Sequence, residues 1–495
     1  MSTGARVSVR PALAIAAGLL LARVWFIAHR ALDLDEFEHA HAAWSVARGL
    51  LPYRDFFEHH PPGLYFLFAP LFAAPAIASN ADVAVRSLIV ARVVMWLMTL
   101  ASVAFVYRLG VLMRGRTAGA LAVVLLATSS QFLESMLEIR PDVPAVLCVL
   151  AAIWCIAGTE AHAASLGPAA CVAGGVAFGM SLLFTQKTLF AAPGLAVALI
   201  QIDRRLTRAG LFALGALVPL VMTAWWFHGH GALAPLWYDT VRVNGRLNAD
   251  RFSPLPRLVS NVVQQPAIYV FGVGAVVAWM TSPIASADNG RAIVRTIVYP
   301  ALSLIAGIFV IGRAYDQYYA LLLPLLAVLG GVLASDLAAR LTPRRARAAT
   351  AAVILAAGSL SVVTSARSFE PIAPQIEAMS WVMQHTAPRD AYLGGSPGAA
   401  LFRPHAWFYF FLTGAFAADA DYRALESALE SGAVQPRLVV MDTYFQRRAP
   451  ASLLAYVTAQ FRRAHGDLYL RQSEYGRSTL NASDASDRFD RPLTR

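Results

Sequence analysis

Apolar runs of about 20 residues recur along most of this chain and constrain its fold more than any other feature. A bilayer core of roughly 30 Å is crossed by about 20 apolar residues in a helix. Runs near that length occur at 11–29, 84–107, 118–134, 143–158, 168–185, 188–202, 209–227, 263–281, 294–311, 318–338 and 348–364. Only 14% of the residues are charged, against about 25% in soluble proteins. We therefore expect an all-α polytopic membrane protein with about 11 transmembrane helices.

The positions of the arginines indicate how the chain crosses the membrane. Suppose that the N-terminus is cytoplasmic and that one further apolar segment, 63–79, does not cross. Arginine clusters at 108–116, 204–208, 291–295 and 340–347 then all fall in the cytoplasm, which is the usual bias of positive charge. If 63–79 crosses, all of them move outside. We therefore predict an interfacial or re-entrant helix at 63–79 and an extracytoplasmic C-terminus. Because orientation accounts for the net charge of +11, no nucleic-acid partner is expected.

The composition changes after about residue 364, where charges become frequent. Helical patterns near 372–386, 421–431 and 450–460 alternate there with strand-like ones at 391–394, 437–443 and 467–471. We expect a transmembrane domain at 1–364, with a first extracytoplasmic loop at about 30–83, followed by a small α/β domain at 365–477. The last residues, 478–495, have too few apolar side chains for a core and are expected to be disordered.

Polar residues that could carry chemistry gather at the span ends predicted to face outward. The first loop contains LDLDEFEHAH (32–41) and YRDFFEHHPPG (53–63). Asp35 precedes a helical pattern that stops at Gly49, so it lies at or near an N-cap, and capping is the structural alternative to catalysis. Later outward turns contribute Glu138, Arg140, Asp142, Lys187, Tyr318 and Tyr319. Carboxylates for base chemistry, cations for an anionic ligand and aromatic rings for a sugar or lipid are therefore expected on one side of the membrane.

Several of these residues form motifs in a fixed order along the chain. The motif residues are Asp35-Glu36; Gly49, Tyr53, Arg54 and Asp55; Pro61, Pro62, Gly63 and Tyr65; Arg140 and Asp142; Lys187 and Pro193; and Tyr319 and Pro324. This ordered set resembles the polytopic GT-C glycosyltransferases that use polyprenyl-phosphate sugars, which include protein mannosyltransferase family 39 and the aminoarabinose transferases. One position departs, because a Glu-Lys pair precedes Pro-Pro in the aminoarabinose transferases. Here that pair reads His59-His60, with Glu58 one step earlier.

The resemblance implies an inverting transfer of a sugar from a polyprenyl-phosphate donor to an extracytoplasmic lipid, glycan or protein at the bacterial plasma membrane. It implies Asp35 as the base, with Glu36 as the fallback. A departing phosphate needs fixed positive charge, and the resemblance places Lys187, His60 and Arg140 around it. The residues expected to bind the substrates are Asp142, Glu58, His59, Tyr318 and Tyr319.

Two other functions remain open at this point. A transporter or a flippase for lipid-linked sugars would also be polytopic, although transporters place polar sites near the bilayer midplane. A non-catalytic glycan-binding scaffold is the third reading. In addition, a divalent metal could bind at the histidines of the first loop and the acids near them, with ordinary hydrogen bonds as the structural alternative. These histidines are His39, His41, His59 and His60.

Overall fold

The computed structural model describes residues 10–161, 167–202, 206–247, 253–281, 288–311, 315–412 and 420–472. The tail predicted to be disordered, 478–495, lies outside the described residues. Contacts divide the chain into two compact units. The helical unit comprises Met1–Ala28, Arg92–Trp226 and Asn248–Phe369, and the mixed unit comprises His29–Ala91, Phe227–Leu247 and Glu370–Arg495.

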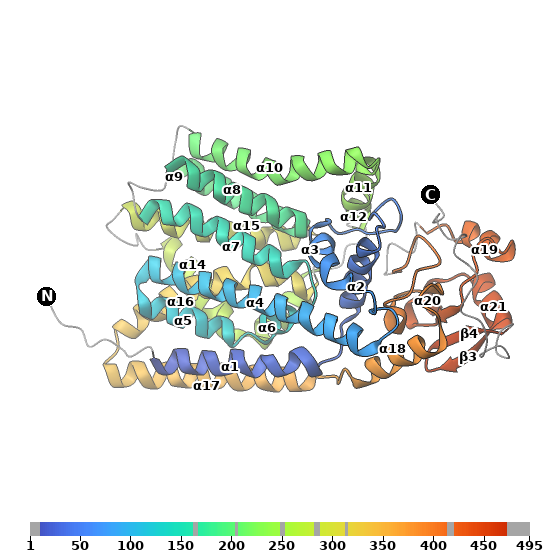
Figure 1. The fold of residues 1–495 in the computed structure, drawn as a ribbon. Coiled ribbons are helices and arrows are strands. Elements are labelled where there is room, and N and C mark those ends of the chain that lie inside the picture. The colour runs from blue at the N-terminus through green and yellow to red at the C-terminus, as the bar shows by residue number, and fades with distance from the viewer. Residues whose placement is uncertain are drawn as a thin grey trace. The chain divides into compact units, whose positions relative to one another are not determined.

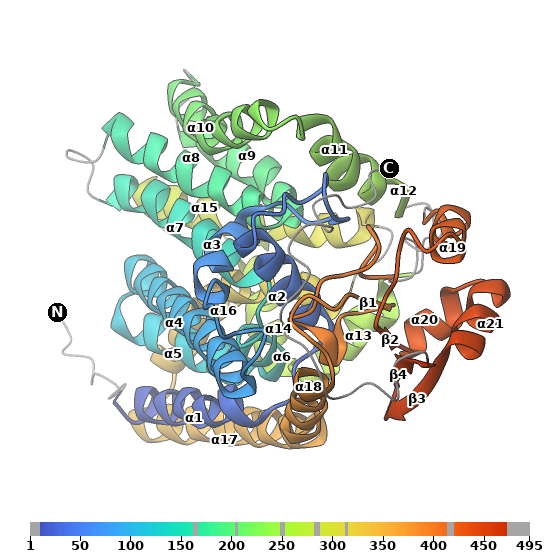
Figure 2. The same cartoon turned by 45° about the vertical axis from the view of Figure 1, so that its right-hand side comes forward.

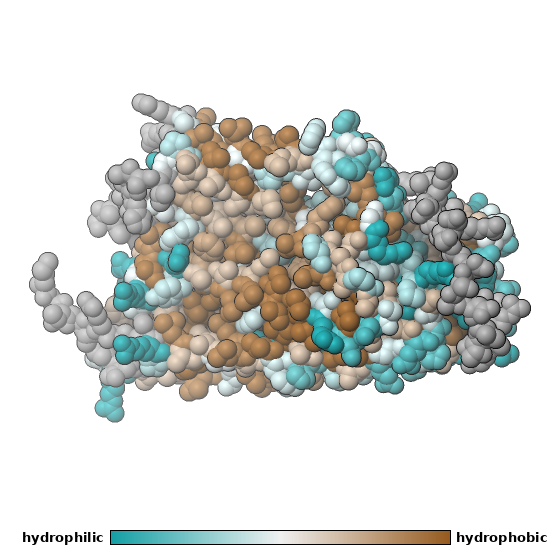
Figure 3. Space-filling model, viewed as in Figure 1, coloured by the Kyte–Doolittle hydropathy of each residue, from teal (hydrophilic) through white to brown (hydrophobic). Residues whose placement is uncertain are grey.

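Apolar helices fall on the predicted spans (Figure 1). They are α1 (Arg10–His29), α4 (Ala81–Arg114), α5 (Arg116–Ala127), α7 (Asp142–Ala161), α8 (Gly167–Phe184), α9 (Ala192–Ile202), α10 (Thr207–Gly229), α14 (Pro266–Thr281), α15 (Asp288–Val310), α16 (Leu323–Ala339) and α17 (Pro343–Arg367). Much of the surface over these helices is hydrophobic (Figure 3). Four of the described helices are long and apolar enough to cross a membrane alone, or five spans if one bent pair counts as a single span. A helical polytopic fold is therefore confirmed, and the number of about 11 spans stays a prediction.

Shorter helices connect the long ones. In the helical unit they are α6 (Ser130–Ser135), η1 (Gln186–Ala191), α13 (Leu255–Gln264) and η3 (Asp316–Leu321). In the mixed unit they are α2 (Leu34–Ala47), α3 (Gly63–Phe72), α11 (Leu233–Trp237), η2 (Tyr238–Val243) and α12 (Asn244–Leu247). The helix predicted at 63–79 is thus present as α3 and ends earlier than expected.

Helices α1 and α17 lie side by side in the helical unit (Figures 1 and 2). Arg23 of α1 donates hydrogen bonds to Ser365 and, at 3.0 Å, to Ser361 of α17. All three residues lie in the second half of their helices. The two helices therefore run in the same direction.

Glycines allow neighbouring helices to approach until their backbones touch. A Cβ atom on Gly175 of α8 would lie 2.0 Å from the carbonyl oxygen of Phe212 in α10. A Cβ on Gly179 would lie 2.2 Å from the carbonyl oxygen of Ala216. Small residues at this four-residue spacing line one helix face, and in lipid such close packing is a main source of helix association. The contact between α8 and α10 therefore depends on the absence of a side chain at these positions.

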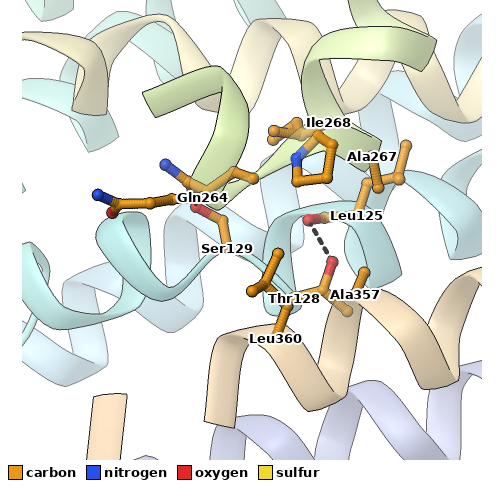
Figure 4. A pocket seen from close by; sticks show the side chains of 10 residues that line it. Leu125, Thr128, Ser129, Gln264, Ala267, Ile268, Ala357 and Leu360 are labelled. Carbon is orange, nitrogen blue, oxygen red and sulfur yellow. Dashed lines mark hydrogen bonds between the residues drawn. The ribbon is translucent and has the colours of Figure 1, made fainter. Parts of the chain in front are cut away.

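The span predicted at 263–281 is bent. Helix α13 meets α14 at an angle of 108°, and the break falls at Gln265-Pro266. Proline suits the first turn of a helix because the N–H it lacks would have no partner there. Gln265 donates to Gln131 Oε1 at 2.6 Å beside the break. A pocket with room for about one water molecule lies at this bend, between α5, α13, α14 and α17 (Figure 4). The described residues that line this pocket include none of the predicted site residues.

The mixed unit contains a four-stranded sheet with the order β1-β2-β4-β3. β1 (Tyr392–Gly394) pairs in parallel with β2 (Leu438–Val440), and β4 (Leu468–Arg471) pairs antiparallel with both β2 and β3 (Phe461–His465). The helices of this part are α18 (Ala373–His385), η4 (Gly398–Ala400), α19 (Tyr422–Glu430), α20 (Thr443–Arg448) and α21 (Ala451–Gln460). The predicted α/β character of the C-terminal part is confirmed, and β3, η4 and α20 are additions to the predicted elements.

The first loop packs against C-terminal residues within the mixed unit. The N–H of Phe57 donates to the carbonyl oxygen of Phe408 at 2.9 Å. On α2, His41 contacts the carbonyl oxygen of Leu401 at 2.8 Å through Nδ1, and His405 at 2.9 Å through Nε2. Burial, as the main cause, lowers the pKa of His41 and brings the pKa of His405 to about 4, so both rings are neutral at pH 7. These contacts fix α2 on the C-terminal part of its own unit.

Replacing Gly175 by alanine is expected to destabilise the helical unit. The new methyl group would meet a backbone oxygen of α10 that cannot move without shifting the helix, and overpacking of this kind costs about 1–3 kcal/mol. Gly210 of α10 is the matched control, because a Cβ there meets nothing within 4 Å. Its change to alanine should leave stability unchanged or raise it by about 0.5–1 kcal/mol. Thermal unfolding of the two purified variants in detergent checks this prediction, and equal unfolding midpoints would contradict it.

Candidate functional site

The N-terminus of α2 shows which acidic residue caps the helix. Asp33 is the N-cap, and its Oδ1 accepts the N–H of Asp35 at 3.0 Å. Glu36 Oε2 accepts the N–H of Asp33 at 3.0 Å, which completes a capping box. Asp35, expected at or near the cap, is the second residue of the helix and is partly buried. Glu36, the fallback base, is fully buried and has a structural role in the cap.

The loop before α3 is held in one shape by the Gly-x-x-x-Tyr-Arg-Asp motif. Tyr53 has φ 71°, in the left-handed region that residues with a side chain seldom adopt. Its hydroxyl donates to the carbonyl oxygen of His60 at 2.7 Å. Asp55 accepts the N–H of Leu51 at 2.7 Å and the Nε–H of Arg54 at 2.8 Å. This motif therefore shapes the loop that presents the two adjacent histidines.

Two carboxylates and two imidazoles converge beside α2. Glu38 and Glu58 are buried, with 2% and 1% exposure. His60 Nδ1 lies 3.0 Å from Glu58 Oε1 and 3.9 Å from Glu38 Oε1, and His59 Nδ1 lies 3.6 Å from each of these oxygens. The predicted residues Glu58, His59 and His60 are thus brought together. Glu38 was not among the predicted site residues, although it follows Asp35 by three positions and so shares its helix face.

Hydrogen bonds to backbone groups orient this acid–histidine cluster (Glu38, Glu58, His59 and His60). Glu58 Oε1 accepts the N–H of His59 at 2.9 Å and of His60 at 3.0 Å. Asn244 of α12 donates from Nδ2 to the carbonyl oxygen of His59 at 2.7 Å. No sequence pattern pointed to Asn244, because it lies 185 residues from His59.

Lys187 lies in η1 of the helical unit, and its side chain is largely buried. Nζ donates to Asp142 Oδ1 at 3.0 Å and to Oδ2 at 3.2 Å, and the Asp142 side chain is 2% exposed. Nζ also lies 4.3 Å from the ring centroid of Tyr318, within cation–π range. Three of the predicted residues therefore meet here. Removing one partner of a buried ion pair typically costs about 3–5 kcal/mol.

The remaining predicted residues divide between the two units. Arg140 donates from Nε to Glu138, and both side chains are buried. Tyr319 is fully buried in η3. The helical unit contains Arg140, Asp142, Lys187, Tyr318 and Tyr319, and the mixed unit contains Asp35, Glu36, Glu58, His59 and His60. The expected grouping of His60 with Lys187 and Arg140 combines residues of both units and stays a prediction.

Known families and structures show similarity to this chain. Residues 60–227 match the family model of the dolichyl-phosphate-mannose-protein mannosyltransferases. ArnT of Cupriavidus metallidurans, crystallised with undecaprenyl phosphate, is similar in structure with a TM-score of 0.63 and 15% identity, over 93% of this chain and 97% of that chain. The oligosaccharyltransferase AglB of Archaeoglobus fulgidus, in complex with an inhibitory peptide and a dolichol phosphate, gives a TM-score of 0.56 and 14% identity, over 88% of this chain and 70% of that chain. A comparison with curated protein sequences finds no match.

The two kinds of similarity reinforce each other. The family match spans Pro61-Pro62, Arg140, Asp142 and Lys187, which are the central motifs of the ordered set. The structural similarity extends over nearly the whole chain at low identity, so it speaks for the fold. The resemblance predicted from the sequence is confirmed to this extent: residues 60–227 match the mannosyltransferase family model, and the fold is similar to the folds of ArnT and AglB.

Proposed function

We propose that this chain is an inverting glycosyltransferase that moves a sugar from a polyprenyl-phosphate donor to an extracytoplasmic acceptor. The family match over 60–227 is the observation that carries this proposal. The similar structures, one with undecaprenyl phosphate and one with a peptide and a dolichol phosphate, support a lipid-linked donor. The family and both similar structures are named as transferases or bind a lipid phosphate, and none of them favours a transporter or flippase.

In the proposed reaction a carboxylate takes the proton of the acceptor hydroxyl. The hydroxyl oxygen bonds to the anomeric carbon, the bond from that carbon to the phosphate oxygen breaks, and the lipid phosphate leaves with the electron pair. We assign the base to Asp35. Capping of α2 is performed by Asp33 and Glu36, so it does not explain an acid at position 35.

The departing phosphate is assigned to Lys187. A lysine ammonium has three N–H donors, and two of them are directed at Asp142. Asp142 thereby positions the ammonium, and one donor remains for a phosphate oxygen. Arg140 and His60 are proposed as further donors to this phosphate. The residues proposed to contact the sugar or the acceptor are Glu58, His59, Tyr318 and Tyr319.

The proposed orientation has the N-terminus in the cytoplasm and the C-terminus outside a bacterial plasma membrane. The parallel course of α1 and α17 supports this, because a chain entering α1 and leaving α17 emerges on opposite faces of the helical unit. The arginine clusters decide which face is cytoplasmic. Under this orientation α2 and the acid–histidine cluster are extracytoplasmic.

The overall proposal is tested by mass spectrometry of envelope glycans and glycoproteins from a strain that lacks this gene. One sugar should be missing and should return when the wild-type gene is supplied. Purified protein should also release polyprenyl phosphate from the matching lipid-linked sugar. A flippase would instead leave that donor unconsumed in the purified system.

Reporter fusions are expected to show opposite sidedness at two positions. A fusion at residue 112 should be cytoplasmic, because it lies in the first arginine cluster, and a fusion at residue 370 should be extracytoplasmic. Alkaline phosphatase and green fluorescent protein activities at both sites provide the measurement. A cytoplasmic signal at 370 would refute the site assignment, since the acids would no longer face a donor outside.

Asp35→Asn is expected to lower transfer by roughly 10²–10⁴-fold, the usual effect of losing an acid–base catalyst. Expression and folding should be unchanged, because the cap itself is Asp33. Asp33→Asn is the matched control, since Asn and Asp are similar N-caps, and it should keep near-normal transfer. Sugar transfer by the purified variants is the measurement. Normal turnover by Asp35→Asn would move the base to Glu36, to be tested with Glu36→Gln, which can preserve the capping box.

Lys187→Arg is expected to fold and yet to transfer at least about tenfold more slowly, because charge-assisted hydrogen bonds contribute about 1.5–3 kcal/mol. Arginine keeps the charge that Asp142 needs but replaces a compact ammonium by a planar guanidinium. Lys187→Ala is less informative, since it leaves the buried Asp142 without its cation and should lower the yield of folded protein.

The control for this substitution is Arg114→Lys, an exchange of the same two residue types in an exposed ion pair with Asp336. It should leave both folding and transfer unchanged. The rate of donor-lipid turnover is measured for both variants. If Lys187→Arg works at the wild-type rate, Lys187 serves only to pair with Asp142, and the phosphate assignment is lost.

A further inference from the structure

We propose that Glu38, Glu58, His59 and His60 form a binding site for a divalent transition-metal cation such as Zn²⁺. The four side chains come from α2 and from the loop before α3. One potential ligand atom from each lies within 4.8 Å of all the others. This inference goes beyond the proposed function. Cation binding can be measured without any sugar donor, so its test does not depend on transfer activity.

The distances within the cluster match the shape of a small metal site. Zn²⁺ is bound at about 2.0–2.2 Å by histidine nitrogen and carboxylate oxygen, so neighbouring ligand atoms of a tetrahedral site lie about 3.3–3.5 Å apart. The Nδ1 to Oε1 distances here are 3.0, 3.6, 3.6 and 3.9 Å. The remaining two pairs of ligand atoms also lie within 4.8 Å, so a small closing movement of the side chains would bring all four groups onto one cation.

The chemistry of the donors also fits. Imidazole nitrogen with carboxylate oxygen is a usual ligand set for zinc and other first-row cations, whereas Mg²⁺ and Ca²⁺ prefer oxygen alone. Glu38 and Glu58 are both buried and face the same two imidazoles. Two buried carboxylates in one place are costly unless positive charge neutralises them. A dication supplies that charge while both imidazoles stay neutral, as metal ligands must be.

Surrounding groups hold the ligands in position. Glu58 Oε1 accepts two backbone N–H groups, and Oε2 is buried beside it. Tyr53, strained at φ 71°, and Asn244 fix the backbone carbonyl oxygens of His60 and His59. Partners outside the first ring of ligands are what orients a metal site, and their loss typically weakens metal affinity by about 10–100-fold.

The cation would also position Asp35. Glu38 follows Asp35 by three residues on the same face of α2. A metal ion bound to Glu38 on α2 and to residues 58–60 on the loop would join these two segments one helical turn from the proposed base. Towards Asp35 the four ligands therefore act as positioning residues, in addition to the substrate contacts proposed above for Glu58, His59 and His60.

Metal binding is tested on the full-length chain purified in detergent. The protein is stripped with EDTA, dialysed against Zn²⁺ and measured by inductively coupled plasma mass spectrometry and by thermal unfolding. We expect about one Zn²⁺ per chain and a higher unfolding midpoint, because a ligand that binds only the folded state stabilises it. Glu58→Gln and His60→Gln should each weaken Zn²⁺ binding at least about 100-fold, since each removes a ligand rather than an outer partner.

Three further measurements separate this site from its alternatives. His385 is an exposed histidine of α18, and His385→Gln should bind as much Zn²⁺ as the wild type. If His385→Gln loses as much Zn²⁺ binding as Glu58→Gln and His60→Gln, the metal binds only to surface histidines. In EDTA, the unfolding midpoint of Glu58→Gln should equal or exceed that of the wild type, because the substitution removes a buried charge. With added Zn²⁺, the wild type should have the higher unfolding midpoint. Asp35→Asn should bind Zn²⁺ as the wild type does, whatever its transfer rate. The proposed metal site and the proposed base can therefore be refuted independently of each other. A wild-type protein without stoichiometric zinc, or variants that bind it equally well, would overturn the proposal.

Discussion

A polypeptide in lipid must satisfy its own backbone hydrogen bonds, and this constraint determines most of the architecture. Each apolar run folds as a helix because the helix pairs every internal N–H and C=O within one segment. Lipid provides no hydrophobic force between such helices, so their association depends on close packing, as Gly175 and Gly179 show between α8 and α10. The charged Lys187 inside this unit is correspondingly paired with Asp142.

Because of the same constraint, the proposed site residues lie at the ends of the spans and in the loops. The backbone of these segments must then be held in place by other contacts. In the mixed unit these contacts are specific and polar. The capping box of Asp33 and Glu36 fixes the start of α2, and the neutral pair of His41 and His405 ties α2 to the C-terminal part. Tyr53 adopts a strained backbone angle to hold the loop before α3. Asp35 thus lies on a fixed helix, which suits its proposed role as the base.

The sequence predicted helices and strands well because hydropathy and periodicity are local properties. The predicted helix ends were less accurate where two features of the same short segment indicated different ends. Asp33 and Asp35 both precede the helical pattern of α2, and the pair Asp33-x-x-Glu36 is the readable capping-box signal that favours Asp33. The run at 263–281 reads as one straight span because its average hydropathy is high, yet Pro266 begins a new helix at the bend. Proline and capping signals therefore deserve more weight than average hydropathy at helix ends.

Side-chain pairing across long sequence distances could not be predicted, and it changes how the site residues are interpreted. Asp142 and Lys187 are 45 residues apart, and from sequence they appeared as an orienting acid and a phosphate ligand with separate roles. Their contact makes them one unit, in which the acid sets the position of the cation. Glu38 and Glu58 are two buried carboxylates that form one cluster with two histidines. In the first case the chain itself provides a permanent cation. In the second, the proposed metal ion would provide the positive charge and would add one more link between α2 and the loop before α3.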